Sequence, residues 1–111
     1  MKSGGTKQVV LITCGSAEEA LGIARSVVRK QLAACANILS APVESVYRWK
    51  GIVEEAREYL LIIKTTARRL KQLEKEVKRL HSYEVPEFIA LPLGGGSREY
   101  LRWIEESVKE A

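Results

Sequence analysis

The sequence predicts an α+β fold, because its hydrophobic runs and turn signals follow the order β-α-β-β-α-β with one more helix at the end. This is the order of a ferredoxin-like, split β-α-β antiparallel sheet, here with a long central hairpin and an extra C-terminal helix. A second observation is that the strand predicted at Tyr59 to Ile63 is apolar on both faces of the sheet. The first two helices cover only one face, so we expect another copy of the chain to cover the second.

Length and composition are those of a single globular domain. The chain has 111 residues, and we expect a flexible N-terminus at 1–7 and one domain at 8–111. No apolar run approaches the roughly 20 residues of a membrane helix, and no signal peptide is evident. Cys14 and Cys35 are expected to be free thiols. These features predict a cytoplasmic protein with no membrane partner. The net charge of +4 is a weak indication of anionic partners.

The first half of the domain begins with a strand at Gln8 to Thr13. Ser16 and Glu19 have the spacing of a capping box, in which the serine hydroxyl accepts from the Glu19 N–H and Glu19 reaches back. A helix is therefore predicted at about 17–31. The following segment, 32–38, suits the start of a strand but is ambiguous on periodicity alone, and a break follows it.

A long hairpin is predicted at the centre of the chain. One strand covers 43–49, Lys50 and Gly51 form the turn, and the second strand is strongest at 59–64. Fully extended, 55–65 measures about 36 Å, whereas the first helix measures about 22 Å. The hairpin should therefore overhang its own domain, and an overhanging edge favours pairing with a neighbouring strand.

Two more helices and a strand complete the domain. Thr65 or Thr66 is expected to cap the first of these helices. Its apolar stripe consists of Leu70, Leu73, Val77 and Leu80. The basic residues around this stripe have no aromatic residues between them, which favours a solvated face, and no nucleic-acid partner is expected. A strand is predicted at 87–93, and Ser97 is expected to cap a last helix that ends near Val108.

Several motifs together carry a resemblance to a known family. They are QLAACANI, SVYRWKG, LLIIKTT, HSYEVPE and YLRWI, in this order and spacing. With them the chain resembles the CutA family of divalent cation tolerance proteins over Val9 to Ile104. The resemblance implies a subunit similar to the PII signalling proteins, and a homotrimer with its three sheets facing inward. It also implies a role in tolerance of copper or other divalent cations, without an established catalytic reaction.

The resemblance also implies metal ligands. Family members proposed to bind copper use a cysteine at the end of the first strand and two adjacent histidines before a PYxxPE segment. Cys14 matches the cysteine and His81 the second histidine, whereas Leu80 stands where the first would be. A thiolate and an imidazole suit copper or zinc. A third ligand could come from a neighbouring subunit, from Glu84 or from water.

Each of these residues also has a structural interpretation. Cys14 precedes a helix N-terminus, which can lower the pKa of a thiol, but small buried thiols at strand ends are common in cores. His81 can cap the helix that it follows. Trp49, near the hairpin tip, suits either a subunit interface or a ligand pocket.

The resemblance also implies a second site, a cleft between subunits. Lys64 lies on an otherwise apolar strand and should face a counter-charge, for which Glu58 and Glu87 are candidates. Cys35 either packs among alanines or lines this cleft. The predicted cleft residues are Cys35, Trp49, Glu58, Lys64, Tyr83, Glu84 and Glu87.

The leading hypothesis is a cytoplasmic homotrimer that binds divalent metal, copper above all, in these clefts. One alternative is a PII-like sensor of a small anion or nucleotide, which would use Lys64. Another is a trimeric scaffold that organises other proteins. Catalysis is not expected, because no Ser/His/Asp order is present and Gly94 to Gly96 lacks the lysine of a phosphate-binding loop.

Overall fold

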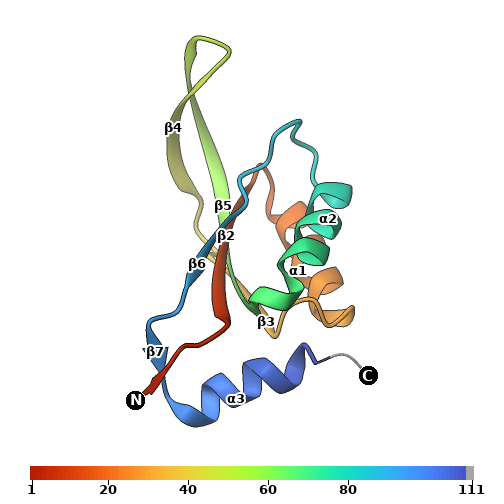
Figure 1. Cartoon of the computed structure of the whole chain (residues 1–111). Coiled ribbons are helices and arrows are strands. Elements are labelled where there is room, and N and C mark those ends of the chain that lie inside the picture. Colours follow the sequence, from red (N-terminus) through yellow and green to blue (C-terminus); the bar gives the residue numbers. More distant parts are fainter. Residues whose placement is uncertain (110–111) are drawn as a thin grey trace.

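The elements follow the predicted order in the computed structural model, which describes residues 1–109 (Figure 1). They are β1 (Lys2–Ser3), β2 (Lys7–Cys14), α1 (Ala17–Arg29), β3 (Cys35–Ile38), β4 (Val43–Trp49), β5 (Ile52–Thr66), a 3-10 turn (Ala67–Arg69), α2 (Leu70–Leu80), β6 (Ile89–Pro92), β7 (Gly95–Gly96) and α3 (Arg98–Ser107). The main sheet has the order β3-β5-β2-β6, and β4 pairs with the outer part of β5. All of these pairs are antiparallel, which confirms the predicted α+β fold.

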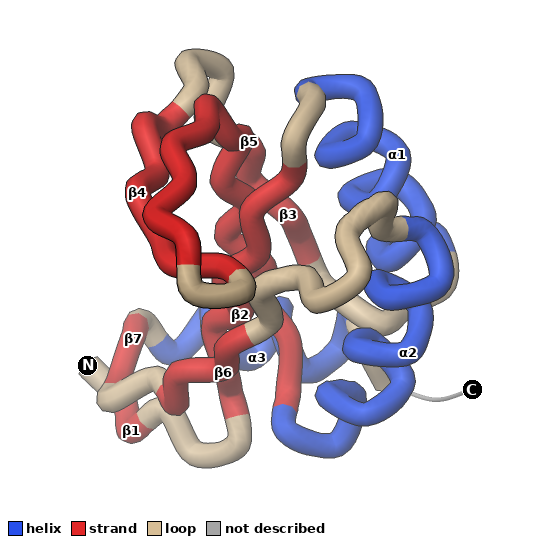
Figure 2. Tube along the Cα trace, turned by 90° about the horizontal axis from the view of Figure 1, so that it is seen from above, coloured by secondary structure: helices blue, strands red, loops and turns tan. Residues whose placement is uncertain are grey.

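One face of the sheet forms the main core under α1 and α2. The register pairs Val10 with Ile63 and Ile12 with Leu61, so these four fully buried side chains lie on the same face. Figure 2 shows both helices on one side of the strands. Burial of each such side chain contributes roughly 1.5–3 kcal/mol. A shift of the register by one residue would expose them all, so this face fixes the strand pairing.

The second face of the sheet is covered only in part, by α3. This helix contacts β2 and β5 at the end of the sheet remote from the hairpin (Figure 1). It closes a small second core of Ala34, Leu101, Ile104 and Val108. Ile89 and Leu91 of β6 pair with Leu11 and Val9 on this face and remain about half exposed. The predicted apolar character of both faces is therefore confirmed.

The hairpin extends beyond the sheet as an arm, defined here as 43–58. The inner half of β5 pairs with β2, whereas its outer half pairs only with β4 (Figure 1). Lys50 and Gly51 form the predicted turn, with φ values of 50° and 83°. Val46 is 68% exposed and Ile52 62% exposed. The arm thus exposes apolar side chains, and little of the described chain packs against them.

The N-terminal segment lies at the edge of the domain, and the predicted flexibility of 1–7 stays a prediction. β1 pairs with β7, and the Gly4 N–H donates to the Gly94 carbonyl over 3.3 Å. A Cβ atom at Gly4 would lie 1.9 Å from the Leu93 carbonyl oxygen, so only glycine allows this close approach. The segment is therefore attached to the edge of the domain. The predicted domain end at residue 111 lies outside the described residues.

The prediction that Thr65 or Thr66 caps the second helix is wrong. The buried Thr65 hydroxyl donates to the Leu32 carbonyl over 2.7 Å, and it ties β5 to the end of α1 instead. Thr66 makes no capping hydrogen bond with its side chain, and the 3-10 turn leads into α2. By contrast, Ser97 caps α3 as predicted and accepts from the Tyr100 N–H.

Candidate metal centre and adjoining cavity

Three potential metal ligands meet where β2 ends. Cys14 is the last residue of β2, Glu19 lies in the first turn of α1, and His81 directly follows α2. The thiol sulfur, one carboxylate oxygen and one ring nitrogen all lie within 4.8 Å of one another. The fold therefore brings the two predicted ligands, Cys14 and His81, together and adds a third.

Hydrogen bonds to the backbone orient the His81 ring. Its Nε2 lies 2.8 Å from the Thr13 carbonyl oxygen, and its Nδ1 lies 3.1 Å from the Tyr83 nitrogen. A carbonyl only accepts and an amide N–H only donates, so Nε2 carries the hydrogen and Nδ1 the lone pair. The Glu19 carboxylate is 3.6 Å from Nδ1. The lone pair that would bind a metal ion thus faces Glu19 but is shared with the Tyr83 N–H.

The Cys14 thiol is fully buried on the helix side of the sheet. Burial raises the pKa of Cys14 from 9.0 to about 12, and the negative charges of Glu19 and Glu58 add to the effect. The nearby helix N-terminus does not offset this desolvation. The thiol is therefore protonated at neutral pH, and a metal ion that binds it must displace the proton.

Glu19 is the member of this group that sequence reasoning missed. Ser16 caps α1 as predicted, because its hydroxyl accepts from the Glu19 N–H over 3.1 Å. The Glu19 carboxylate, however, accepts from the N–H (3.0 Å) and the hydroxyl (3.2 Å) of Ser82. It thereby fastens the segment after α2 to α1, beside His81. The signal in the sequence was a carboxylate in a first helical turn just after a cysteine at a strand end.

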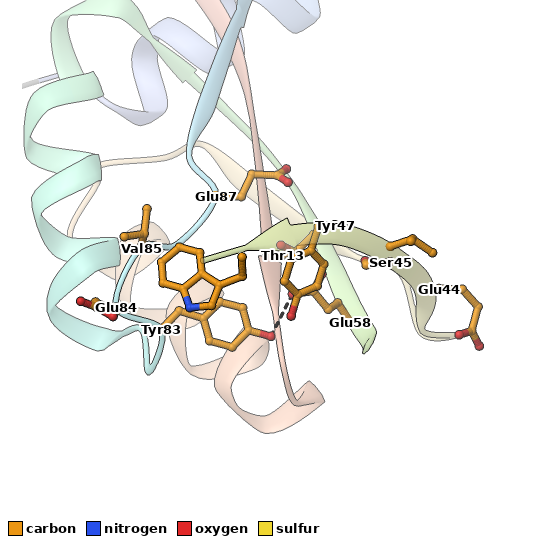
Figure 3. A pocket seen from close by; sticks show the side chains of 11 residues that line it. Thr13, Glu44, Ser45, Tyr47, Glu58, Tyr83, Glu84, Val85 and Glu87 are labelled. Atoms are coloured by element: carbon orange, nitrogen blue, oxygen red, sulfur yellow. Dashed lines mark hydrogen bonds between the residues drawn. The ribbon is translucent and has the colours of Figure 1, made fainter. Parts of the chain in front are cut away.

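A cavity of about 670 Å³ adjoins this group, between the arm and the exit segment, residues 82–87 (Figure 3). It is lined by Thr13, Glu44, Ser45, Val46, Tyr47, Trp49, Glu58, Tyr83, Glu84, Val85 and Glu87. The Tyr83 hydroxyl donates to the Glu58 carboxylate over 2.8 Å, a bond that spans from the exit segment to β5 (Figure 3). Thr13 and Tyr83, whose backbones hold His81, are both in this wall.

The cavity lining is acidic, although basic side chains outside it pair with two of its glutamates: Arg57 with Glu44 at 2.9 Å and Lys50 with Glu84 at 3.8 Å. Among the 11 described residues that line it, four are glutamates and none is lysine, arginine or histidine. Burial raises the pKa of Glu87, and the charge of Glu58 raises it further. Burial, together with the bond to Glu58, also raises the pKa of Tyr83, so this hydroxyl remains a donor. Such a lining favours cations and disfavours anions.

The structure brings five of the seven predicted cleft residues together. Trp49, Glu58, Tyr83, Glu84 and Glu87 all line the cavity. Trp49 is partly exposed there, so its role as an assembly anchor stays a prediction.

Cys35 and Lys64 lie elsewhere within the subunit. They are cross-strand partners near α3, where the Cys35 sulfur is 3.8 Å from the Tyr100 hydroxyl. The expected counter-charge of Lys64 is absent among its described partners, and its amine donates to the Asn37 side chain instead. The reason is distance, since Glu58 is six residues away along β5, about 20 Å in a strand.

Comparisons with known proteins settle the family. The sequence model of "CutA1 divalent ion tolerance protein" matches residues 8–107. The chain belongs to the CutA1 family. It is 48% identical to the divalent-cation tolerance protein CutA of Thermus thermophilus over 101 residues, which are 91% of this chain and 97% of that protein. The CutA1 resemblance inferred from the motifs is thereby confirmed.

Solved CutA structures agree with the fold. The Thermus thermophilus structure superposes with a TM-score of 0.88, and the Xylella fastidiosa structure with 0.90 at 34% identity, covering 95% of this chain and 100% of that one. The chloroplastic CutA of Arabidopsis thaliana is 46% identical over 91% of this chain, which spans only 55% of that relative. Among the described residues, no helix has the length and apolarity that crossing a membrane requires.

Proposed function

We propose that this CutA1 protein binds a divalent metal ion, with copper as the leading candidate, through Cys14, Glu19 and His81. The observation that carries the proposal is the approach of their ligand atoms to within 4.8 Å of one another. A sulfur, a nitrogen and an oxygen donor form a set that copper and zinc accept. Glu19 takes the place of the missing histidine, because Leu80 cannot coordinate. The protein would hold the ion and, in this proposal, catalyses no reaction.

The acidic cavity supports metal capture. Its glutamates raise the local concentration of cations next to His81, whose backbone partners belong to the cavity wall. The same lining counts against the small-anion or nucleotide sensor, because Lys64, its expected basic residue, is not part of the cavity. The hypothesis of a trimeric scaffold does not depend on these residues, so the acidic lining neither supports it nor counts against it.

The second part of the proposal is a homotrimer, as the family resemblance implies. Support comes from the half-exposed Ile89 and Leu91 on the second sheet face and from the exposed Val46 and Ile52 on the arm. Apolar surface of this kind is typical of an interface. The arm of one copy would then border the cavity of another and make it an inter-subunit cleft. Light scattering at micromolar concentration should give three times the 12.4 kDa chain mass, and a monomer mass would overturn this part.

We also propose a cytoplasmic location. Both cysteines are free thiols, which suits a reducing compartment. The names of relatives state a chloroplast for the Arabidopsis protein and the periplasm for the Archaeoglobus fulgidus structure, so fractionation of the native host is the appropriate test.

Isothermal titration tests the metal site. Zinc is the first probe because, unlike copper, it does not oxidise thiols, and copper follows. We expect Cys14→Ser and Glu19→Gln each to weaken binding at least about tenfold. Cys35→Ser is the matched control, since it removes the other free thiol, remote from the site, and should leave the affinity unchanged. Equal affinity of Cys14→Ser and the unmodified protein would overturn the assignment.

A further inference from the structure

The cavity combines two kinds of wall that recognise one class of ligand. Three aromatic residues, Tyr47, Trp49 and Tyr83, line it together with its glutamates. Aromatic faces attract organic ammonium groups through their quadrupoles, and carboxylates attract them through charge. A hydrated inorganic ion gains little from aromatic walls, so the rings indicate a cation that carries carbon.

The chain itself already places an ammonium group against this combination. The Lys50 Nζ lies 5.7 Å from the centroid of the Trp49 ring and 3.8 Å from a Glu84 carboxylate oxygen. Trp49 belongs to the arm and Glu84 to the exit segment, and both line the cavity. Lys50 is itself largely exposed, so no packing forces its amine there. Lys50 follows Trp49 directly in the chain, and its amine illustrates how an alkylammonium group fits between the Trp49 ring and the Glu84 carboxylate.

The cavity has the size of a small-molecule site. Its volume of about 670 Å³ falls within the roughly 300–1,000 Å³ of typical ligand pockets. Figure 3 shows the exit-segment side chains of Glu84 and Val85 on one side and those of Ser45 and Glu44, from the arm, on the other. A ligand with a positive charge at each end of a short carbon chain can therefore approach Glu84 on one side and, in competition with Arg57 at 2.9 Å, Glu44 on the other.

We infer that this cavity binds an organic ammonium cation, a short aliphatic diamine or polyamine, between the aromatic residues and the glutamates. Lys50 competes with the ligand for Trp49 and Glu84. The site is distinct from the metal group, because no thiol or imidazole takes part in it. It does not rest on the proposed metal function, and Cys14→Ser should bind the diamine as the unmodified protein does.

Isothermal titration with 1,5-diaminopentane tests the inference on the protein as it assembles in solution. We expect a dissociation constant below about 1 mM. 1,5-Pentanediol, of the same length but uncharged, should give no binding, and magnesium chloride at equal ionic strength should not displace the diamine. Glu87→Gln should weaken binding about three- to fivefold. The matched control is Glu99→Gln on α3, which removes an equal charge outside the cavity and should change the affinity less than about twofold.

Lys50→Asn is the sharper variant. Asparagine followed by glycine keeps the turn, and removal of the competing amine should strengthen diamine binding about two- to fivefold. If Lys50 only stabilised the turn, its replacement would not strengthen diamine binding. Equal binding of the diol, displacement by magnesium, weakening by Glu99→Gln as large as by Glu87→Gln, or no gain with Lys50→Asn would each overturn the inference. Absence of any diamine binding, as when a neighbouring copy fills the cavity, would overturn it as well.

Discussion

Metal binding through Cys14 should depend steeply on pH. Burial raises the pKa of this thiol from 9.0 to about 12, so the metal ion displaces a proton that is held about 1,000 times more tightly than in an ordinary thiol. The thiol is protonated throughout the physiological range, and one proton leaves for each ion bound. The zinc association constant should therefore rise about tenfold for each pH unit between pH 7 and 9.

A competition titration against a chromogenic chelator of known pH dependence measures this slope. The range above pH 7 avoids the ordinary titration of imidazoles. In Cys14→Ser the affinity should be lower and nearly independent of pH, whereas Cys35→Ser should keep both the slope and the affinity. A flat profile in the unmodified protein, or an unchanged slope in Cys14→Ser, would refute the argument that a protonated, buried thiol is a ligand.

Three further predictions concern the ligand set, the assembly and the helix layer. Leu80→His should restore the adjacent histidine pair and strengthen copper binding at least about tenfold in the same titration. Val53→Glu, on the exposed arm, should lower the mass measured by light scattering while circular dichroism stays unchanged. Hydrogen bonds from Arg79 hold the pKa of Glu76 well below its ordinary 4.5, so the stability that they provide is present above about pH 4.5 and is lost as the pH falls. Urea unfolding from pH 7 to 3 should show a smaller loss for Glu76→Gln, with Glu74→Gln, a partly exposed carboxylate that pairs with Lys78 at 3.0 Å, as the control.

Much of the fold could be predicted because local signals and burial agree. The two-faced apolar strands, the Lys50-Gly51 turn and the caps at Ser16 and Ser97 all act within a few residues of chain, and the structure contains each of them. The wrong cap at Thr65 has the opposite cause. Its hydroxyl is taken by Leu32, 33 positions away, and no local pattern reveals such a partner.

The candidate site was predictable only in its ligand types. The family motifs indicated Cys14 and His81, but the third candidate ligand, Glu19, becomes visible only once α1 and the end of α2 are packed side by side. The pKa of Cys14 likewise depends on tertiary burial, which outweighs the helix N-terminus that the sequence suggests. Lys64 was expected to face Glu58 or Glu87 because it lies on an apolar strand, but Glu58 is six residues away along β5, about 20 Å at about 3.3 Å per residue, and its place in a cleft between subunits stays a prediction.

X-ray absorption at the zinc edge, on protein loaded with one equivalent of zinc, tests the metal assignment most directly. The structure predicts one sulfur at about 2.3 Å and nitrogen and oxygen ligands at about 2.0–2.2 Å. The sulfur should disappear in Cys14→Ser and remain in Cys35→Ser. A first shell made only of nitrogen and oxygen in the unmodified protein would contradict the proposal that Cys14, Glu19 and His81 hold the metal.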